Sequence, residues 1–165
     1  MYQLGDYVMY GKDVCKVYEI NEKRFNNEDY YLLRPVKDES LKIEVPVSNK
    51  NGKIRNLISS LEAEEIISKI PMIPVIDTDE KFIENEYKNL LQDATHEDLI
   101  RIIKTSYLRN QNRLKDKKKL SEKDTKYFEL AEEYLYHEFS IVLGFSYEDT
   151  KKYIVDKVHS LESNA

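Results

Sequence analysis

The period of the apolar residues changes once along this chain, near residue 59, and the change limits the possible folds. Before it, "LKIEVPV" alternates its apolar residues with Lys42 and Glu44, and "GDYVMY" would place Tyr7 and Met9 on one side and Val8 and Tyr10 on the other. That two-residue period is typical of a half-buried strand. After it, the apolar residues recur every three or four positions, which is typical of amphipathic helices. The sequence therefore predicts an α+β protein with strands first and helices second.

The first part contains five candidate strands separated by turn signals. They are "GDYVMY", "DVCKVYEI", "DYYLLRPV", "LKIEVPV" and "KIRNL", and "NKNG" at 49–52 is a turn signal between the last two. Short antiparallel strands at this spacing predict a small barrel or a curled sheet. Pro46 has no N–H to donate to a ladder, so we expect it at an edge strand or a bulge.

The second part reads as helices over 59–70, 82–91, 96–114, 120–143 and 146–158. Two prolines interrupt the pattern in "PMIPVIDTDE", and a proline inside a helical pattern ends the helix. We therefore predict a linker at 71–80, which would separate a β-module at 1–70 from a helical domain at 81–165.

Three residues carry signals for helix ends in the last part of the chain. Ser121 and Ser146 are predicted N-caps, and Gly144 is a predicted C-cap. Asp124 follows Ser121 by three residues, which predicts a variant of the capping box.

The composition argues against several function classes. The single cysteine, Cys15, lies in an alternating strand pattern, which favours packing in a reducing compartment. No apolar run approaches the roughly 20 residues that span a bilayer. His96, His137 and His159 are too far apart for the spacing of a metal site. We expect no catalytic residue, metal or cofactor, no membrane partner, and a cytoplasmic protein that is not an enzyme.

Positive charge gathers between residues 99 and 127, although the net charge of the chain is −5. Three acidic residues in this run, Asp116, Glu122 and Asp124, stand against ten basic ones. The basic residues are Arg101, Lys104, Arg109, Arg113, Lys115, Lys117, Lys118, Lys119, Lys123 and Lys126. Such a run is either a solvated helix face or a surface that follows a phosphate backbone. The charge pattern by itself leaves both interpretations open.

Several stretches together resemble the CarD/CdnL family of bacterial transcription regulators. "LGDYVMYGKDVCKVYEI", "YYLL", "LKIEVPV" and "KIRNL" are similar to the strands of the family, and they occur in the same order. "YKNLL" and "LSEKDTKYFELAEEYLYHEF" are similar to its C-terminal helices. Each piece is short, and the order of the pieces over most of the chain carries the resemblance.

The resemblance implies a Tudor-like antiparallel β-barrel module that binds the lobe of the RNA polymerase β subunit. It also implies an all-α domain that contacts promoter DNA at the upstream edge of the melted region. Such a protein would be a nucleoid-associated monomer that stabilises the open promoter complex. The alternative is an adaptor whose β-module binds a protein partner and whose helices form a scaffold without DNA binding.

The resemblance also indicates residues for the polymerase-binding surface. Lys23, with Arg24 beside it, matches one basic position of the family. Glu44 stands before the Val-Pro pair where the family has a basic residue, so the charge of this surface differs. Arg55 matches the arginine embedded in the last strand.

For DNA binding, the family uses a tryptophan as a wedge in the minor groove, and this chain has no tryptophan. Ile83 takes that position in an alignment without gaps, and Phe82 precedes it. Ile83 belongs to the apolar stripe of its helix, so Phe82 is our first choice for the wedge. Lys88, Lys104 and Arg109 are the cations we expect to contact phosphates.

Overall fold

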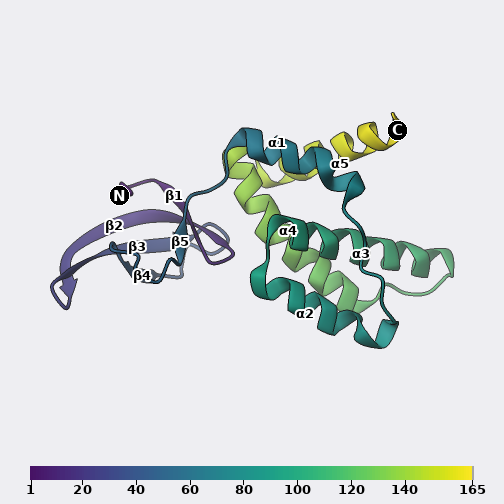
Figure 1. Cartoon of the computed structure of the whole chain (residues 1–165), viewed down its shortest axis with the longest axis horizontal. Helices are drawn as coiled ribbons and strands as arrows, with labels where there is room; N and C mark the ends of the chain where they lie inside the picture. The colour runs from purple at the N-terminus through teal and green to yellow at the C-terminus, as the bar shows by residue number, and fades with distance from the viewer. Residues whose placement is uncertain (165) are drawn as a thin grey trace. The chain divides into compact units, whose positions relative to one another are not determined.

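The computed structural model describes residues 1–164 and divides the chain into two compact units. Met1–Ser59 forms the sheet unit and Ser60–Ala165 forms the helical unit (Figure 1). The α+β class is confirmed, with a five-stranded sheet followed by helices. The division at Ser59 differs from the linker that we predicted at 71–80.

All neighbouring strands of the sheet unit are antiparallel. The strands are β1 (Tyr7–Tyr10), β2 (Asp13–Phe25), β3 (Glu28–Pro35), β4 (Ile43–Pro46) and β5 (Ile54–Arg55). Their spatial order is β4-β3-β2-β1-β5, so β4 and β5 are the two edges and the sheet is open rather than a closed barrel. Pro46 lies on an edge strand, as predicted.

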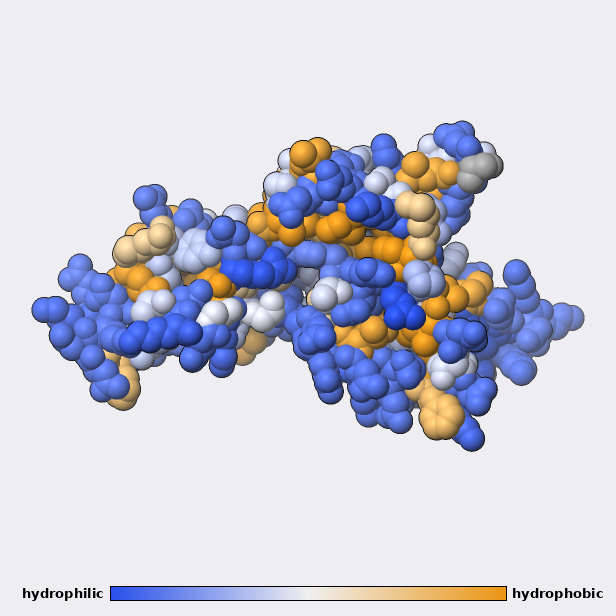
Figure 2. Space-filling model, in the orientation of Figure 1, coloured by the Kyte–Doolittle hydropathy of each residue, from blue (hydrophilic) through white to orange (hydrophobic). Residues whose placement is uncertain are grey.

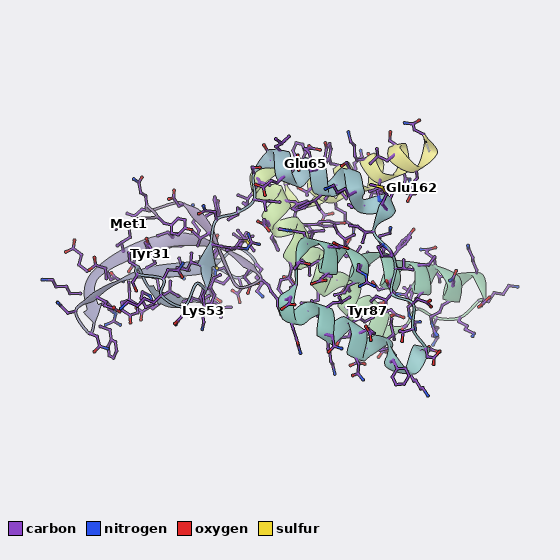
Figure 3. The ribbon with its side chains drawn as sticks, in the orientation of Figure 1. Met1, Tyr31, Lys53, Glu65, Tyr87 and Glu162 are labelled. Carbon is purple, nitrogen blue, oxygen red and sulfur yellow. The ribbon has the colours of Figure 1, made fainter. Side chains whose placement is uncertain are left out.

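One face of this sheet forms the hydrophobic core of the sheet unit. Its buried residues are Val8, Cys15, Val17, Tyr31, Leu33, Val45 and Ile54. Tyr31, labelled in Figure 3, is 1% exposed, and its hydroxyl accepts a hydrogen bond from the backbone N–H of Tyr2 at 2.9 Å. Cys15 is fully buried in this core, and burial raises the pKa of its thiol to about 12, as is typical of a packing residue.

The helical unit contains five α-helices and two short 3₁₀ helices. They are α1 (Ser60–Lys69), η1 (Ile70–Met72), η2 (Glu80–Phe82), α2 (Ile83–Asp93), α3 (His96–Lys115), α4 (Glu122–Leu143) and α5 (Tyr147–Ser163). The helices α3 and α4 make the most extensive helix–helix contact, and α1 packs against both α4 and α5. That packing explains why α1 belongs to the helical unit and not to the β-module.

The helix ends agree with the predicted caps except at one residue. Ser121 and Ser146 accept backbone hydrogen bonds as N-caps, and Gly144 ends α4 in the left-handed conformation with φ of 74°. Asp124 does not complete a capping box, because its carboxylate is directed into the helix bundle. Instead, the N–H of Ser121 donates to Oδ1 of Asn110 at 2.9 Å. A complete capping box occurs at the start of α3, around Thr95.

Between residues 1 and 164, the structure contains no helix that is long and apolar enough to cross a membrane.

Candidate functional site

The segment of residues 70–76, which we call the strap, is fastened to α3 by hydrogen bonds. Nζ of Lys104 donates to the carbonyl oxygens of Ile70 at 2.8 Å and Ile73 at 2.6 Å. Nε of Arg101 donates to the carbonyl of Pro74 at 3.2 Å, and Oγ1 of Thr105 accepts from the N–H of Ile76 at 2.9 Å. These contacts make the predicted linker a packed part of the helical unit.

Lys104 therefore has a structural role that the sequence did not reveal. The last carbonyls of a helix lack partners within the helix, and the cation of a lysine satisfies them well. Lys104 meets that need at the end of α1, where η1 begins. Desolvation by burial lowers the pKa of Lys104, with the charge of Glu162 acting in the opposite direction. The structure thus places Lys104 in internal contacts and not on an open phosphate-binding face.

Arg109 is also engaged inside the helical unit. Its Nε atom lies 3.1 Å from Oδ2 of Asp124, whose side chain is 0% exposed. Tyr87 donates its hydroxyl hydrogen to Oδ1 of Asp124 at 2.8 Å, and burial followed by this hydrogen bond raises the pKa of Tyr87. Nη2 of Arg109 lies 3.6 Å from Oε1 of Glu80. The network joins η2, α2, α3 and α4, and Figure 3 labels Tyr87 within the bundle.

Phe82 and Ile83 occupy different environments, as their positions relative to the apolar stripe indicated. The side chain of Ile83 is 1% exposed and belongs to the core, whereas Phe82 is 47% exposed. Nζ of Lys81 lies 5.0 Å from the centroid of the Phe82 ring. The buried Ile83 fixes the start of α2, and Phe82 beside it faces outward. The pair of the exposed Glu80 with Arg109 adds only about 0–1 kcal/mol.

The connection between α3 and α4 carries most of the exposed positive charge of the basic run. We call residues 114–120 the tip; its four lysines are Lys115, Lys117, Lys118 and Lys119, and all are exposed. The N–H of Lys118 donates to the carbonyl of Arg113 at 2.8 Å, and Nε of Arg113 donates to the carbonyl of Lys119 at 2.7 Å. Figure 2 shows a largely hydrophilic projection there. The charged break "KDKKK" in the sequence was the signal for this surface.

Lys88 on α2 remains exposed at 60%, and it forms an ion pair with Glu84 one turn earlier at 3.3 Å. An exposed pair of this kind contributes only about 0–1 kcal/mol. A phosphate can therefore replace Glu84 as the partner of Lys88 at little cost.

The structure brings two of the predicted polymerase-binding residues into contact. Nε of Arg24 lies 3.2 Å from Oε1 of Glu44, and both side chains are exposed. Lys23 adopts a left-handed conformation with φ of 49°, and its N–H donates to Oδ1 of Asp29 at 3.0 Å. Arg55 lies on β5, at the sheet edge opposite β4. Three of the four residues therefore lie on the β2–β3–β4 side of the sheet, and Arg55 does not.

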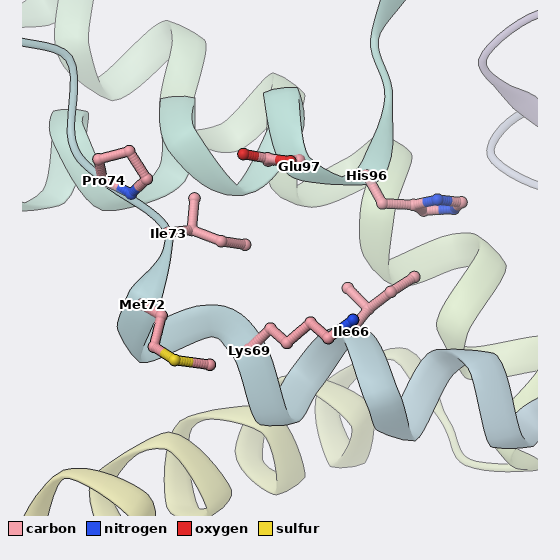
Figure 4. A pocket seen from close by; sticks show the side chains of 7 residues that line it. All are labelled: Ile66, Lys69, Met72, Ile73, Pro74, His96 and Glu97. Atoms are coloured by element: carbon pink, nitrogen blue, oxygen red, sulfur yellow. The ribbon is translucent and has the colours of Figure 1, made fainter.

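A cavity of about 390 Å³ lies between α1, the strap and the start of α3. Its lining consists of Ile66, Lys69, Met72, Ile73, Pro74, His96 and Glu97 (Figure 4). His96 points away from the other lining side chains. Its Nε2 atom lies 2.8 Å from Oε1 of Glu138, which is 2% exposed. In the described part of the chain, no group of three or more His, Cys, Asp or Glu residues is arranged to hold a metal ion.

No model of a known protein family matches the chain, and no curated protein matches its sequence. The function is therefore inferred from the surfaces described above and from the family resemblance of the sequence.

Proposed function

We propose that this chain is a non-enzymatic transcription factor. Its sheet unit would bind the RNA polymerase β subunit, and its helical unit would contact promoter DNA at the upstream edge of the melted region. The observation that carries the proposal is the tip, where four exposed lysines gather at the connection between α3 and α4. The net charge of the whole chain is −5.

The sheet unit supports the polymerase-binding half of the proposal through its open edges. An exposed edge strand can pair with a strand of a partner, and the backbone hydrogen bonds then supply affinity. The edge strand β4 carries Glu44, and the charge pair of Glu44 with Arg24 lies beside it. We propose that this side of the sheet acts as the Tudor-like docking surface. Because Glu44 is acidic where the family has a basic residue, the surface would prefer a partner of different charge.

The helical unit supports the DNA-binding half with a revised set of residues. Exposed lysines on the tip, together with Lys88, can neutralise phosphates without giving up a buried partner. Phe82 supplies an exposed apolar ring that can enter a base step as a wedge. Lys104 and Arg109 act indirectly, because Lys104 fastens the strap and Arg109 pairs with the buried Asp124 of the helical unit.

The mechanism would be differential binding. A factor that contacts melted DNA better than duplex DNA shifts the opening equilibrium by the difference in binding free energy alone. A difference of about 1.4 kcal/mol changes the ratio of open to closed complexes tenfold. Contacts from Phe82 to an opened base step are of this kind, since a closed duplex has no gap to fill.

A protein-interaction adaptor without DNA binding is the second candidate. It is favoured by the internal contacts of Arg101, Lys104 and Arg109. These three cations of α3 belong to the basic run that suggested DNA binding, and their contacts within the helical unit make them less available to phosphates.

Salt dependence of DNA binding separates the two candidates. The full-length chain should bind duplex promoter DNA with an affinity that falls steeply with salt, because phosphate neutralisation releases counterions. The double variant Lys117→Gln/Lys118→Gln should lower the log–log slope by about 0.9 for each phosphate that is no longer neutralised. The control Lys152→Gln/Lys157→Gln changes two exposed lysines of α5 and should keep the slope. Equal slopes for the two variants would favour the adaptor.

Binding to the β subunit tests the other half of the proposal. The full-length chain should retain purified RNA polymerase β subunit on an affinity column. Reversing Lys23 and Arg24 to Glu should weaken retention, because Arg24 no longer pairs with Glu44 and two cations of the docking side become anions. Absence of any affinity of the wild-type chain for the β subunit would refute this assignment.

A further inference from the structure

A row of aromatic and cationic side chains lies on the face of the sheet opposite the cluster around Tyr31, where the neighbouring Met9 and Val14 are buried. Tyr7 of β1 is the register partner of Lys16 of β2, and Lys16 is the register partner of Arg34 of β3. Residues opposite one another in a ladder project from the same face. Tyr18 lies at a register shift of β2 between Val17 and Glu19, and it joins the row because Lys16 and Arg34 lie against its ring. Tyr7 is 38% exposed and Tyr18 is 37% exposed, so both rings are open to solvent.

The cations of this row are held against the rings. Nζ of Lys16 lies 5.8 Å from the ring centroid of Tyr7 and 5.9 Å from that of Tyr18. Cζ of Arg34 lies 5.1 Å from the ring centroid of Tyr18, and Nη1 of Arg34 donates to the carbonyl of Glu39 at 2.6 Å. These distances are within the range of cation–π attraction. The four side chains are thus arranged before any ligand arrives.

We propose that this row binds single-stranded DNA, with Tyr7 and Tyr18 stacking on bases and Lys16 and Arg34 pairing with the phosphates between them. The two rings flank the single cation of Lys16, which suits two successive bases joined by one phosphate. Every base has a flat face, so this kind of binding tolerates different sequences. The assignment to DNA rests on the proposed function, which places the chain beside a melted promoter.

Two other occupants fit the row less well. Duplex DNA presents its phosphates to the cations, but its base faces are already stacked and cannot meet the two rings. An acidic peptide would pair with Lys16 and Arg34, but its carboxylates would not stack on the two flat rings beside them. The alternation of exposed rings with cations is the pattern of single-strand binding surfaces.

The test measures affinity of the full-length chain for short oligo(dT) by fluorescence anisotropy. Tyrosine emission gives a second signal, because the chain has no tryptophan, and stacked bases should quench it. Tyr18→Leu should weaken binding about 5- to 150-fold, since leucine offers apolar area without a flat ring. Tyr18→Phe keeps the ring and should bind as the wild type does. Lys16→Gln should weaken binding and reduce its salt dependence.

The control Tyr107→Leu removes an exposed tyrosine of the helical unit and should leave oligo(dT) affinity unchanged. Equal affinity of Tyr18→Leu and the wild-type chain would overturn the proposal. The proposal would also be overturned if Lys117→Gln/Lys118→Gln lost oligo(dT) binding while the variants of the row kept it. That result would place the single strand on the tip. Tighter binding of oligo(U) RNA than of oligo(dT) would overturn the assignment to DNA.

Parallel measurements with duplex promoter DNA and the β subunit keep the two proposals distinct. If both of these bind while oligo(dT) does not, the row fails as a single-strand site and the proposed function stands. If oligo(dT) binds through Tyr18 while the β subunit and duplex DNA do not, the proposed function fails and the row is a single-strand site in another setting. If Tyr18→Leu loses only the β subunit, the row is a protein-docking surface and the inference is wrong.

Discussion

Nε of Arg109 on α3 lies 3.1 Å from Oδ2 of Asp124 on α4, and the side chain of Asp124 is completely buried. A buried carboxylate without a partner is very unfavourable, so Arg109 and the hydroxyl of Tyr87 must both be present to neutralise and satisfy it. One residue of the basic run is therefore needed to keep the two longest helices together. Its positive charge is paired within the helical unit.

Removing Arg109 should destabilise the chain strongly. Arg109→Met leaves the charge of Asp124 buried and unpaired, and breaking a buried pair from one side costs about 3–5 kcal/mol. Urea denaturation followed by circular dichroism measures the free energy of unfolding. Lys115→Met, which changes an exposed lysine of the same helix, should stay within about 0.5 kcal/mol of the wild type. If Arg109→Met lowers the free energy of unfolding by less than about 1 kcal/mol, the pair does not hold the bundle together.

Removing Lys104 should loosen the strap. Hydrogen bonds from a charged group contribute about 1.5–3 kcal/mol each, so we expect Lys104→Met to lower the free energy of unfolding by about 2–3 kcal/mol. Limited proteolysis should then cut within residues 70–79 sooner than in the wild type. Lys88→Met, whose lysine makes only an exposed ion pair, is the control. Identical proteolysis patterns for the two variants would mean that other contacts hold the strap.

Phe82 and Ile83 should respond in opposite ways to truncation. Ile83→Ala opens a cavity in the core and should cost about 2–5 kcal/mol, measured by urea denaturation. Phe82→Ala changes an exposed side chain and should alter stability by no more than about 0.5 kcal/mol. If Phe82 is the wedge, Phe82→Ala shortens the lifetime of the open promoter complex and Phe82→Trp lengthens it. An unchanged lifetime with a folded, bound Phe82→Ala variant would exclude Phe82 as the wedge.

Glu132 should make stability depend on pH. Its side chain is 6% exposed, and desolvation raises the pKa of the carboxyl above 4.5, although Lys151 at 3.3 Å acts in the opposite direction. A raised pKa in the folded state means that the folded chain binds the proton more tightly than the unfolded chain. This contribution to stability is fully present below pH 4.5 and is lost as pH rises through the folded pKa.

Glu132→Gln removes that titration and should flatten the melting temperature between about pH 4 and pH 7 relative to the wild type. Differential scanning calorimetry across this range measures it. Glu133→Gln changes the neighbouring carboxyl on α4 and should keep the slope of the wild type. A slope in Glu132→Gln as steep as that of the wild type would assign the pH dependence to other groups.

Local signals predicted much of the fold. The strands β1 and β4 and the caps at Ser121, Gly144 and Ser146 depend on residues close in sequence, and the structure confirms them. The predicted alternation fails in β1, where the adjacent Val8 and Met9 are both buried. The capping box at Thr95 was also readable, because "THED" places Asp98 three residues on. These features depend on backbone geometry, which a few neighbouring residues determine.

Pairings between distant residues could not be predicted. Asp124 has the spacing of a capping box, but its partners Arg109 and Tyr87 are 15 and 37 residues away. The prolines at 71 and 74 correctly ended a helix, yet nothing local indicated that Lys104 would bind the strap across more than 30 residues. Charge counting identified the basic run and could not separate its internal cations from the exposed lysines of the tip.

The lifetime of the open complex formed by RNA polymerase on a linear promoter tests the proposed function most directly. Competitor DNA is added after opening, and the decay of the complexes is followed with and without the full-length chain. The proposed function predicts a longer lifetime with the wild-type chain, a smaller effect with Lys117→Gln/Lys118→Gln or Phe82→Ala, and a full effect with Lys152→Gln/Lys157→Gln. The same lifetime with and without a wild-type chain that is bound to the polymerase would contradict it.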